Sequence, residues 1–332
     1  MKRFYCNCGG EIFFENHQCL NCQTAVGFDP ERMQMVTLDH AEHLAYCANE
    51  PQFGACNWVR SQSSDNPLCT ACQFNRTIPN LGLDDNLKYW TLLEQAKKRL
   101  FFTLMQLGLP LHSGWEKPGS GLLFDFLDDA RSKPEHFEDS FVTSGFSHGV
   151  VTLNLLEADD IARAAMQAEM REPYRTLLGH FRHESGHYYW SLLVANAQRL
   201  SDFKCLFGDP DADYANALET YYQNGPAPRW SETHISAYAT AHPLEDWAET
   251  WGHYLHIFDA LETAQAHNLI PNMTEDVTIA DRVSAWQQVS VMLNELNRSV
   301  GRTDAYPFSI GPLVVEKLQL VDRVIEDLRD LQ

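Results

Sequence analysis

The sequence has few positive charges for its length. Of its 332 residues, 25 are Lys or Arg and 45 are Asp or Glu, which gives a formal net charge of −20. Proteins that bind nucleic acids contact phosphate mainly through Lys and Arg. Residues 1–78, where such binding would be expected of a zinc ribbon, carry five basic and eight acidic side chains. The charge therefore disfavours a nucleic-acid partner.

Long apolar runs are also missing. No stretch approaches the roughly 18 consecutive apolar residues of a membrane span. The N-terminal residues MKRFYCNCGG reach polar residues and glycine where a signal peptide needs an apolar segment. We therefore expect a protein that does not cross a membrane and that resides in the cytoplasm.

Cysteine is almost absent after residue 72. Eight of the nine cysteines lie within residues 1–72, and Cys205 is the remaining one. Because thiols in the cytoplasm stay reduced, the clustering favours metal binding over disulfides. No nucleophile signature surrounds Cys205, so we assign it no role and interpret it as a small buried side chain.

The clustered cysteines have the spacing of zinc ligands. A C-x-C pair and a C-x-x-C pair could each give two thiolates to one tetrahedral zinc, which is typical of a zinc ribbon. A later C-x-x-C needs two more ligands, and these follow partly by elimination. The first predicted site is Cys6, Cys8, Cys19 and Cys22, and the second is Cys47, Cys56, Cys69 and Cys72. Metal-free surface thiols are the alternative.

The chain divides by composition near residue 78. Residues 1–78 are rich in Cys, Gly, Asn and Pro, which predicts hairpins and loops stapled by metal. Residues 79–332 form the second predicted domain, with a helix over 85–107 and strands within 122–129 and 149–160. Helices follow from residue 159, with breaks near Pro173, at 208–213, at 224–228, at Pro243 and at 270–276. These patterns predict an α+β protein with a small sheet and many helices.

An HExxH motif lies inside a strongly helical segment, residues 174–195. His183 and His187 are one turn apart and about 40° apart around the helix, so both could bind one ion. In HExxH sites the glutamate, here Glu184, is not a ligand. It acts as general base and later protonates the leaving amine. His180 lies roughly 10 Å from His187 along the axis, too far to share that ion, which favours an indirect or structural role.

A catalytic zinc usually has three protein ligands and one open position. No H-x-x-G-x-x-H continuation follows His187, so the third ligand must come from elsewhere. The helix predicted over 242–261 carries Glu245 and Glu249 one turn apart, an arrangement similar to that of gluzincins. We expect Glu245 to bind zinc and Glu249 to orient a ligand histidine. Asp246 and Glu249 are rival ligands, and an acidic helix start stabilised by the helix dipole is the structural alternative.

Tyr238 precedes this helix and is the candidate for a third catalytic task. A tyrosine near the zinc can donate a hydrogen bond to the oxyanion that forms when water attacks a peptide carbonyl. A purely structural tyrosine is the equal alternative. His242 is expected to cap the helix.

The chain resembles a bacterial family of zinc-ribbon proteins with a zinc-binding metallopeptidase domain. The resemblance covers nearly the whole chain and implies a zincin-like fold, with the strand around 149–156 near the active-site cleft. It implies no particular substrate. The segments that carry it are the N-terminal C-x-C and C-x-x-C, LCTACQFNRTIPNL (68–81), HGVVTLNLLEADD (148–160), GHFRHESGHYYW (179–190), SAYATAHPLEDWAETWGHYLHI (236–257) and LNELNRSVGRTDAYPF (293–308).

These features predict a zinc peptidase with one catalytic and two structural zinc ions. Its substrate would be a protein or peptide, and the ribbon would bind a partner or the substrate. The alternative is a non-catalytic adaptor that binds proteins through the ribbon and carries a vestigial HExxH site. The intact Glu184 favours the enzyme, because a purely structural site has no use for a general base.

Overall fold

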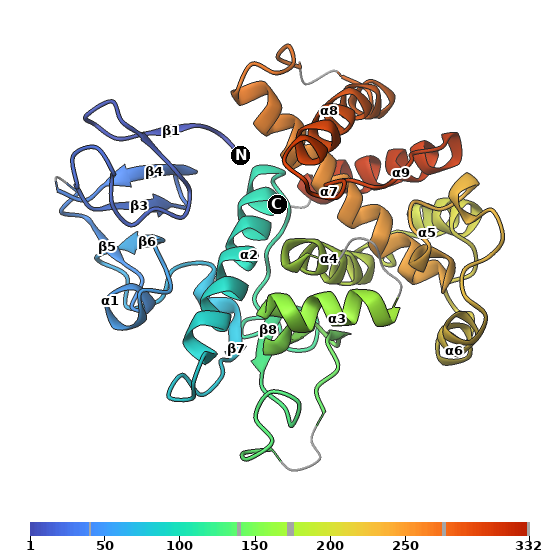
Figure 1. Ribbon diagram of the computed structural model, residues 1–332, viewed down its shortest axis with the longest axis horizontal. Helices are drawn as coiled ribbons and strands as arrows, with labels where there is room; N and C mark the ends of the chain where they lie inside the picture. The colour runs from blue at the N-terminus through green and yellow to red at the C-terminus, as the bar shows by residue number, and fades with distance from the viewer. Residues whose placement is uncertain (40, 138–140, 171–175, 274–276, 331–332) are drawn as a thin grey trace. The chain divides into compact units, whose positions relative to one another are not determined.

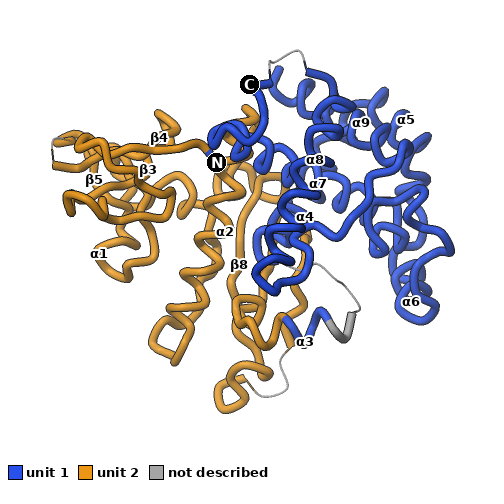
Figure 2. The backbone as a smooth tube through the Cα atoms, turned by 45° about the horizontal axis from the view of Figure 1, so that its top comes forward, with its two compact units in different colours: residues 1, 164–332 blue, residues 2–163 orange. Residues whose placement is uncertain are grey.

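The computed structural model describes residues 1–39, 41–137, 141–170, 176–273 and 277–330. These residues form two compact units, residues 2–163 and residues 164–332 together with Met1 (Figure 2). Each unit is described by itself below. The division into domains 1–78 and 79–332 stays a prediction. None of the helices in the described residues has the length and apolarity needed to cross a membrane.

The N-terminal part of the first unit consists of three short antiparallel hairpins, as the composition predicts (Figure 1). An aromatic cluster of Phe14, Phe28 and Trp58 fills the space between them, and Phe102 from the following helix packs against Phe14 and Phe28. The elements are β1 (Phe4–Tyr5) with β2 (Glu11–Ile12), β3 (Val26–Asp29) with β4 (Gln34–Thr37), β5 (Leu44–Tyr46) with β6 (Val59–Ser61), and the short α1 (Asn49–Phe53).

The rest of this unit is a long helix and a small sheet. The helix predicted over 85–107 is α2 (Asn86–Gln106), and the two predicted strands are β8 (Leu123–Leu127) and β10 (Val150–Asn154). Strand order is β7-β8-β10-β9, in which β7 (Asn75–Thr77), β8 and β10 are parallel and β9 (Gly145–Ser147) is antiparallel to β10. The 3-10 turns η1 (Cys72–Phe74) and η2 (Leu155–Ala158) flank β7 and β10. The prediction that β10 lies near the active-site cleft remains a prediction.

The second unit is helical, and the α+β class predicted from the sequence is confirmed. Its helices end close to the predicted breaks, but the break near Pro173 lies outside the described residues, as does part of 270–276. Two further breaks, at 194–196 and 300–311, were not predicted. The second contains Gly301, Pro307 and Gly311, so a sequence signal for it was present. The elements are α3 (Asp160–Met170), which begins in the first unit, α4 (Leu177–Leu193), α5 (Ala197–Leu206), α6 (Tyr214–Asn224), η3 (Trp230–Glu232), η4 (Tyr238–Thr240), α7 (Pro243–Ala266), α8 (Ile279–Ser299) and α9 (Pro312–Arg329).

Helices α4 and α7 pack closely because a glycine stands where they cross. A Cβ added at Gly186 would lie 2.9 Å from the Cα of Ala248, so any larger residue would push the helices apart. Two indole N–H groups of α7 tie the contact together: Trp247 donates to the Gly186 carbonyl at 2.9 Å and Trp251 to Ser185 Oγ at 3.0 Å. A Cβ added at Gly252, also on α7, would make only ordinary contacts of 3.5 Å or more.

Candidate metal centres

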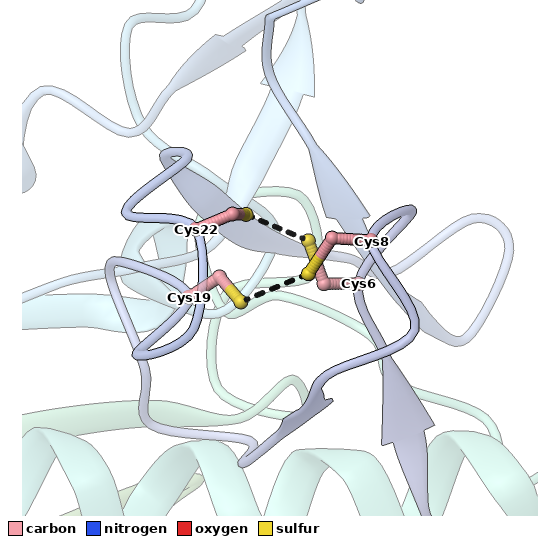
Figure 3. A group of neighbouring side chains, drawn as sticks. All are labelled: Cys6, Cys8, Cys19 and Cys22. Carbon is pink, nitrogen blue, oxygen red and sulfur yellow. Dashed lines mark hydrogen bonds between the residues drawn. The ribbon is translucent and has the colours of Figure 1, made fainter.

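The first four-cysteine cluster brings its sulfurs together at the distance that zinc requires. Figure 3 shows the four side chains pointing toward one another, with Cys6 Sγ 3.6 Å from Cys22 Sγ and Cys8 Sγ 3.8 Å from Cys19 Sγ. Four thiolates at 2.3 Å from a tetrahedral zinc are roughly 3.8 Å apart. The donor set therefore fits zinc. Cys6 and Cys19 are buried, whereas Cys8 and Cys22 are exposed. Cys205, which lies outside both clusters, is also exposed, so the prediction that it is buried is wrong.

The second cluster, Cys47, Cys56, Cys69 and Cys72, is buried throughout. Cys56 Sγ lies 3.7 Å from Cys69 Sγ and 3.8 Å from Cys72 Sγ, which again fits tetrahedral zinc. The four cysteines that were assigned partly by elimination therefore lie together in one cluster.

Two buried lysines of α2 lie beneath this second cluster. Lys98 donates to the Ala55 carbonyl at 2.8 Å, and Lys97 forms a buried ion pair with Glu94 at 2.8 Å. Burial lowers the pKa of Lys98, but Cys56, Cys72 and Glu94 raise it above its usual value. The charged lysine offsets the negative charge of four thiolates around a divalent ion, a role that the sequence alone does not reveal.

The HExxH histidines meet a carboxylate of α7. Glu245 Oε2 lies 3.1 Å from His183 Nε2, and Glu245 Oε1 lies 3.5 Å from His187 Nε2. One donor atom of each of the three side chains lies within 4.8 Å of the others. Zinc bonds of about 2.0–2.2 Å to nitrogen and oxygen separate tetrahedral donors by roughly 3.4 Å. This set of two imidazoles and one carboxylate fits a zinc ion with an open fourth position.

The charge states of Glu245 and His187 suit metal binding. Burial raises the pKa of Glu245, but hydrogen bonding and charge interaction with His183, with smaller contributions from His187 and Tyr214, lower it to about 2. Burial also lowers the pKa of His187, which favours its neutral form. Metals bind ionised carboxylates and neutral imidazoles, so Glu245 and His187 need little change of protonation to act as ligands. Burial lowers the pKa of His183, but hydrogen bonding and charge interaction with Glu245 and Glu249 raise it well above its usual value, so His183 must release a proton to bind a metal.

Glu184 is buried beside this set and is held by one oxygen. Its Oε1 lies 3.0 Å from His180 Nε2, while Oε2 has no hydrogen-bond partner among the described residues. Burial raises the pKa of Glu184, but the hydrogen bond with His180 and the neighbouring histidines lower it below its usual value. The carboxylate is thus ionised, and its Oε2 is buried. The indirect role expected for His180 agrees with this contact.

Glu249 contacts the far nitrogen of a predicted ligand. Its Oε1 lies 2.6 Å from His183 Nδ1, and its Oε2 accepts a hydrogen bond of 2.6 Å from Ser236 Oγ. A carboxylate on Nδ1 leaves Nε2 free to face the metal and fixes the imidazole plane. This is the geometry proposed for Glu249 from the sequence. Ser236 was not foreseen, because nothing local in the sequence distinguishes it from other serines.

Asp246, the rival ligand, does not join His183 and His187 but forms a buried ion pair. Its Oδ2 lies 2.5 Å from Lys317 Nζ of α9 and 3.6 Å from His234 Nε2. Lys317 Nζ also donates to the Thr233 carbonyl at 2.8 Å. Asp246 is not among the donors that meet at His183 and His187.

Two tyrosines lie near the predicted site. The ring centroid of Tyr238, in η4, is 6.0 Å from that of His183, and no hydrogen bond joins its hydroxyl to the donor set. Burial and the charge of Glu245 raise the pKa of Tyr238, so its hydroxyl stays protonated and able to donate. Tyr214, the first residue of α6, donates to Glu245 Oε1 at 2.7 Å. Sequence reasoning missed Tyr214 because it lies 31 residues from its partner in an unremarkable polar helix.

His242 caps α7, as expected. Its Nδ1 accepts a hydrogen bond of 3.1 Å from the Leu244 N–H, and Pro243 occupies the first turn. This cap sets the start of α7 and so the height at which Glu245 meets the two histidines.

Family models match almost the whole chain. The model described as "Putative zinc-binding metallo-peptidase" matches residues 86–324, and a zinc-ribbon domain model matches residues 3–83. Because the first model covers more than half of the chain, the protein belongs to this zinc-binding metallopeptidase family.

The chain is also similar to mycobacterial proteins over nearly its whole length. An uncharacterized protein of Mycobacterium bovis and uncharacterized proteins of two Mycobacterium tuberculosis strains are each 41% identical over 340 residues. The alignments cover 99% of this chain and 96% of each relative. No solved structure matches the chain.

Proposed function

We propose that this protein is a zinc-dependent peptidase that hydrolyses amide bonds in a protein or peptide substrate. The observation that carries the proposal is the convergence of His183, His187 and Glu245 beside the buried carboxylate of Glu184. Three protein donors leave one coordination position open, as in catalytic rather than structural zinc sites. Zinc bound there would supply a Lewis acid for the hydrolysis of a peptide carbonyl.

Glu184 has the geometry of a general base in this reaction. His180 holds its Oε1, so Oε2 can accept a proton from the attacking water and return it to the leaving amine. Glu249 and Ser236 keep the His183 imidazole in one orientation throughout.

Tyr238 remains the candidate for stabilising the oxyanion. Its ring lies beside His183, and its raised pKa keeps the phenol able to donate. A hydroxyl that donates to the developing negative charge stabilises the transition state more than the substrate. We expect Tyr238→Phe to lower kcat with little effect on zinc binding.

The N-terminal zinc ribbon would serve partner or substrate binding. Tyr5, Phe13 and Leu20 are large apolar side chains on its surface, each more than half exposed. Exposed aromatic and aliphatic side chains of this kind favour a protein or peptide over a nucleic acid. The reduced thiols that two closed zinc sites require favour a cytoplasmic location.

The proposal is tested by comparing the parent with Glu184→Gln on a proteome-derived peptide library. Peptides cleaved by the parent should stay intact with Glu184→Gln, although both proteins carry the same amount of zinc. Glu316→Gln is the matched control, because Glu316 is exposed on α9. This variant should cleave the same peptides as the parent does. Equal cleavage by parent and Glu184→Gln, or none by the zinc-loaded parent, contradicts the proposal and favours the non-catalytic adaptor.

A further inference from the structure

Tyr214 lies outside every motif of the sequence, yet its hydroxyl reaches a predicted metal ligand. We infer that Tyr214 is a positioning residue that holds Glu245 Oε1, so that the carboxylate faces the metal through Oε2 alone. This inference rests on the proposed zinc site of His183, His187 and Glu245, but it does not depend on peptidase activity.

The contacts of the Glu245 carboxylate carry the argument. Its Oε1 accepts the hydrogen bond from Tyr214 at 2.7 Å and lies 3.5 Å from His187 Nε2, while its Oε2 lies closer to a histidine nitrogen, 3.1 Å from His183 Nε2. A carboxylate with both oxygens available can bind an ion through both and so occupy two positions. A donor on one oxygen favours binding through the other. The fourth position that catalysis needs is then kept open.

The orientation of Tyr214 is fixed from two sides. Its ring packs edge-on against His242, with centroids 5.0 Å apart, and His242 Nε2 lies 3.1 Å from the Ala212 carbonyl just before α6. Asp213 caps α6 by accepting from the Asn216 N–H. His242, which caps α7, therefore also contacts the start of α6. These contacts direct the Tyr214 hydroxyl toward Glu245.

This anchoring matters because α6 is held by little else at that end. None of its residues is fully buried, so apolar burial contributes little to its attachment. Tyr214 itself is 42% exposed. Its hydroxyl nevertheless donates to a carboxylate that is 1% exposed, and a hydrogen bond to such a buried acceptor restricts the position of that carboxylate.

The test measures zinc affinity at the third site by chelator competition, with both cysteine sites filled. Tyr214→Phe removes only the hydroxyl and should weaken this zinc by about 10–100-fold, the usual effect of losing a partner of a metal ligand. Tyr89→Phe is the matched control, because it also removes a tyrosine hydroxyl that donates to a carboxylate, that of Asp159, but in the unit without the third site. This variant should bind zinc as the parent does.

Cobalt placed in the third site gives a second readout. A four-coordinate cobalt ion absorbs visible light more strongly than a five-coordinate one. Tyr214→Phe should therefore reduce this absorption if Glu245 then binds through both oxygens, and the control should leave it unchanged.

The outcomes separate this inference from the proposed function. Parent-like zinc affinity and an unchanged cobalt spectrum in Tyr214→Phe overturn the inference, even if the parent is an active peptidase. The expected loss of affinity supports it, even if no peptide is cleaved. A parent that binds no third ion overturns both.

Discussion

Neighbouring carboxylates of α7 should respond in opposite ways to removal, although Glu245 and Asp246 are adjacent and equally buried. Glu245→Ala removes a donor from the His183 and His187 set and should release one of three zinc ions without unfolding the protein. Asp246→Ala should keep all three ions, because its carboxylate belongs to Lys317. It should instead lower the stability of the fold.

The size of the Asp246→Ala effect follows from the burial of the ion pair. Asp246 and Lys317 are 1% and 2% exposed, and removing one partner of such a pair costs about 3–5 kcal/mol. Lys317 keeps one acceptor, the Thr233 carbonyl, which favours the lower end. In a unit of 150–250 residues each kcal/mol shifts the melting temperature by about 2–4 °C. We therefore expect a decrease of about 6–12 °C.

The assay combines elemental analysis of zinc with thermal melting followed by circular dichroism. The double variant Asp246→Ala with Lys317→Met is the control, and it should recover most of the stability because no unpaired charge stays buried. Loss of one zinc ion from Asp246→Ala at a parent-like melting temperature would refute this reasoning. So would three tightly bound ions in Glu245→Ala.

Three further predictions concern the elements around the site. Glu249→Ala should weaken zinc binding at the third site by about 10–100-fold in chelator competition. Ser236→Ala should weaken it less, because only Glu249→Ala leaves His183 Nδ1 without its carboxylate. Equal zinc affinity in the parent and both variants would count against the orienting role of Glu249. Gly186→Ala should lower the melting temperature and weaken the third zinc, since its Cβ would meet α7 backbone at 2.9 Å, and unchanged values of both would contradict the close packing. A mild oxidant should release zinc from the first cysteine site before the second, because two sulfurs of the first are exposed, and the reverse order, followed by a zinc-sensitive dye, would be inconsistent with that difference.

The features that could be predicted from the sequence are those that depend on residues close together in the chain. Helix α2, the strands β8 and β10 and most helix ends follow from short-range periodicity and breakers. The first cysteine cluster follows from spacing. The histidines of α4 are brought together by one helical turn, so their shared site needs no tertiary information.

The contacts that complete the site join distant parts of the chain. Glu245 and Glu249 could be proposed from their stripe on α7, but choosing between Glu245 and Asp246 depends on Lys317, 71 residues away. Tyr214 lies 31 residues from Glu245 and Ser236 lies 13 residues from Glu249, so no local sequence signal pointed to either contact. The close approach at Gly186 rather than Gly252 was also hidden, because a helical wheel shows which face a glycine lies on but not where two axes cross.

The proposed peptidase activity depends most directly on a third zinc ion at the HExxH helix. Anomalous diffraction at the zinc edge from crystals of the full chain would place every zinc without any substrate. We expect three peaks: one within each four-cysteine cluster and one bounded by His183 Nε2, His187 Nε2 and Glu245 Oε2. Peaks at the two cysteine clusters alone, in protein grown with excess zinc, would contradict the proposed catalytic site.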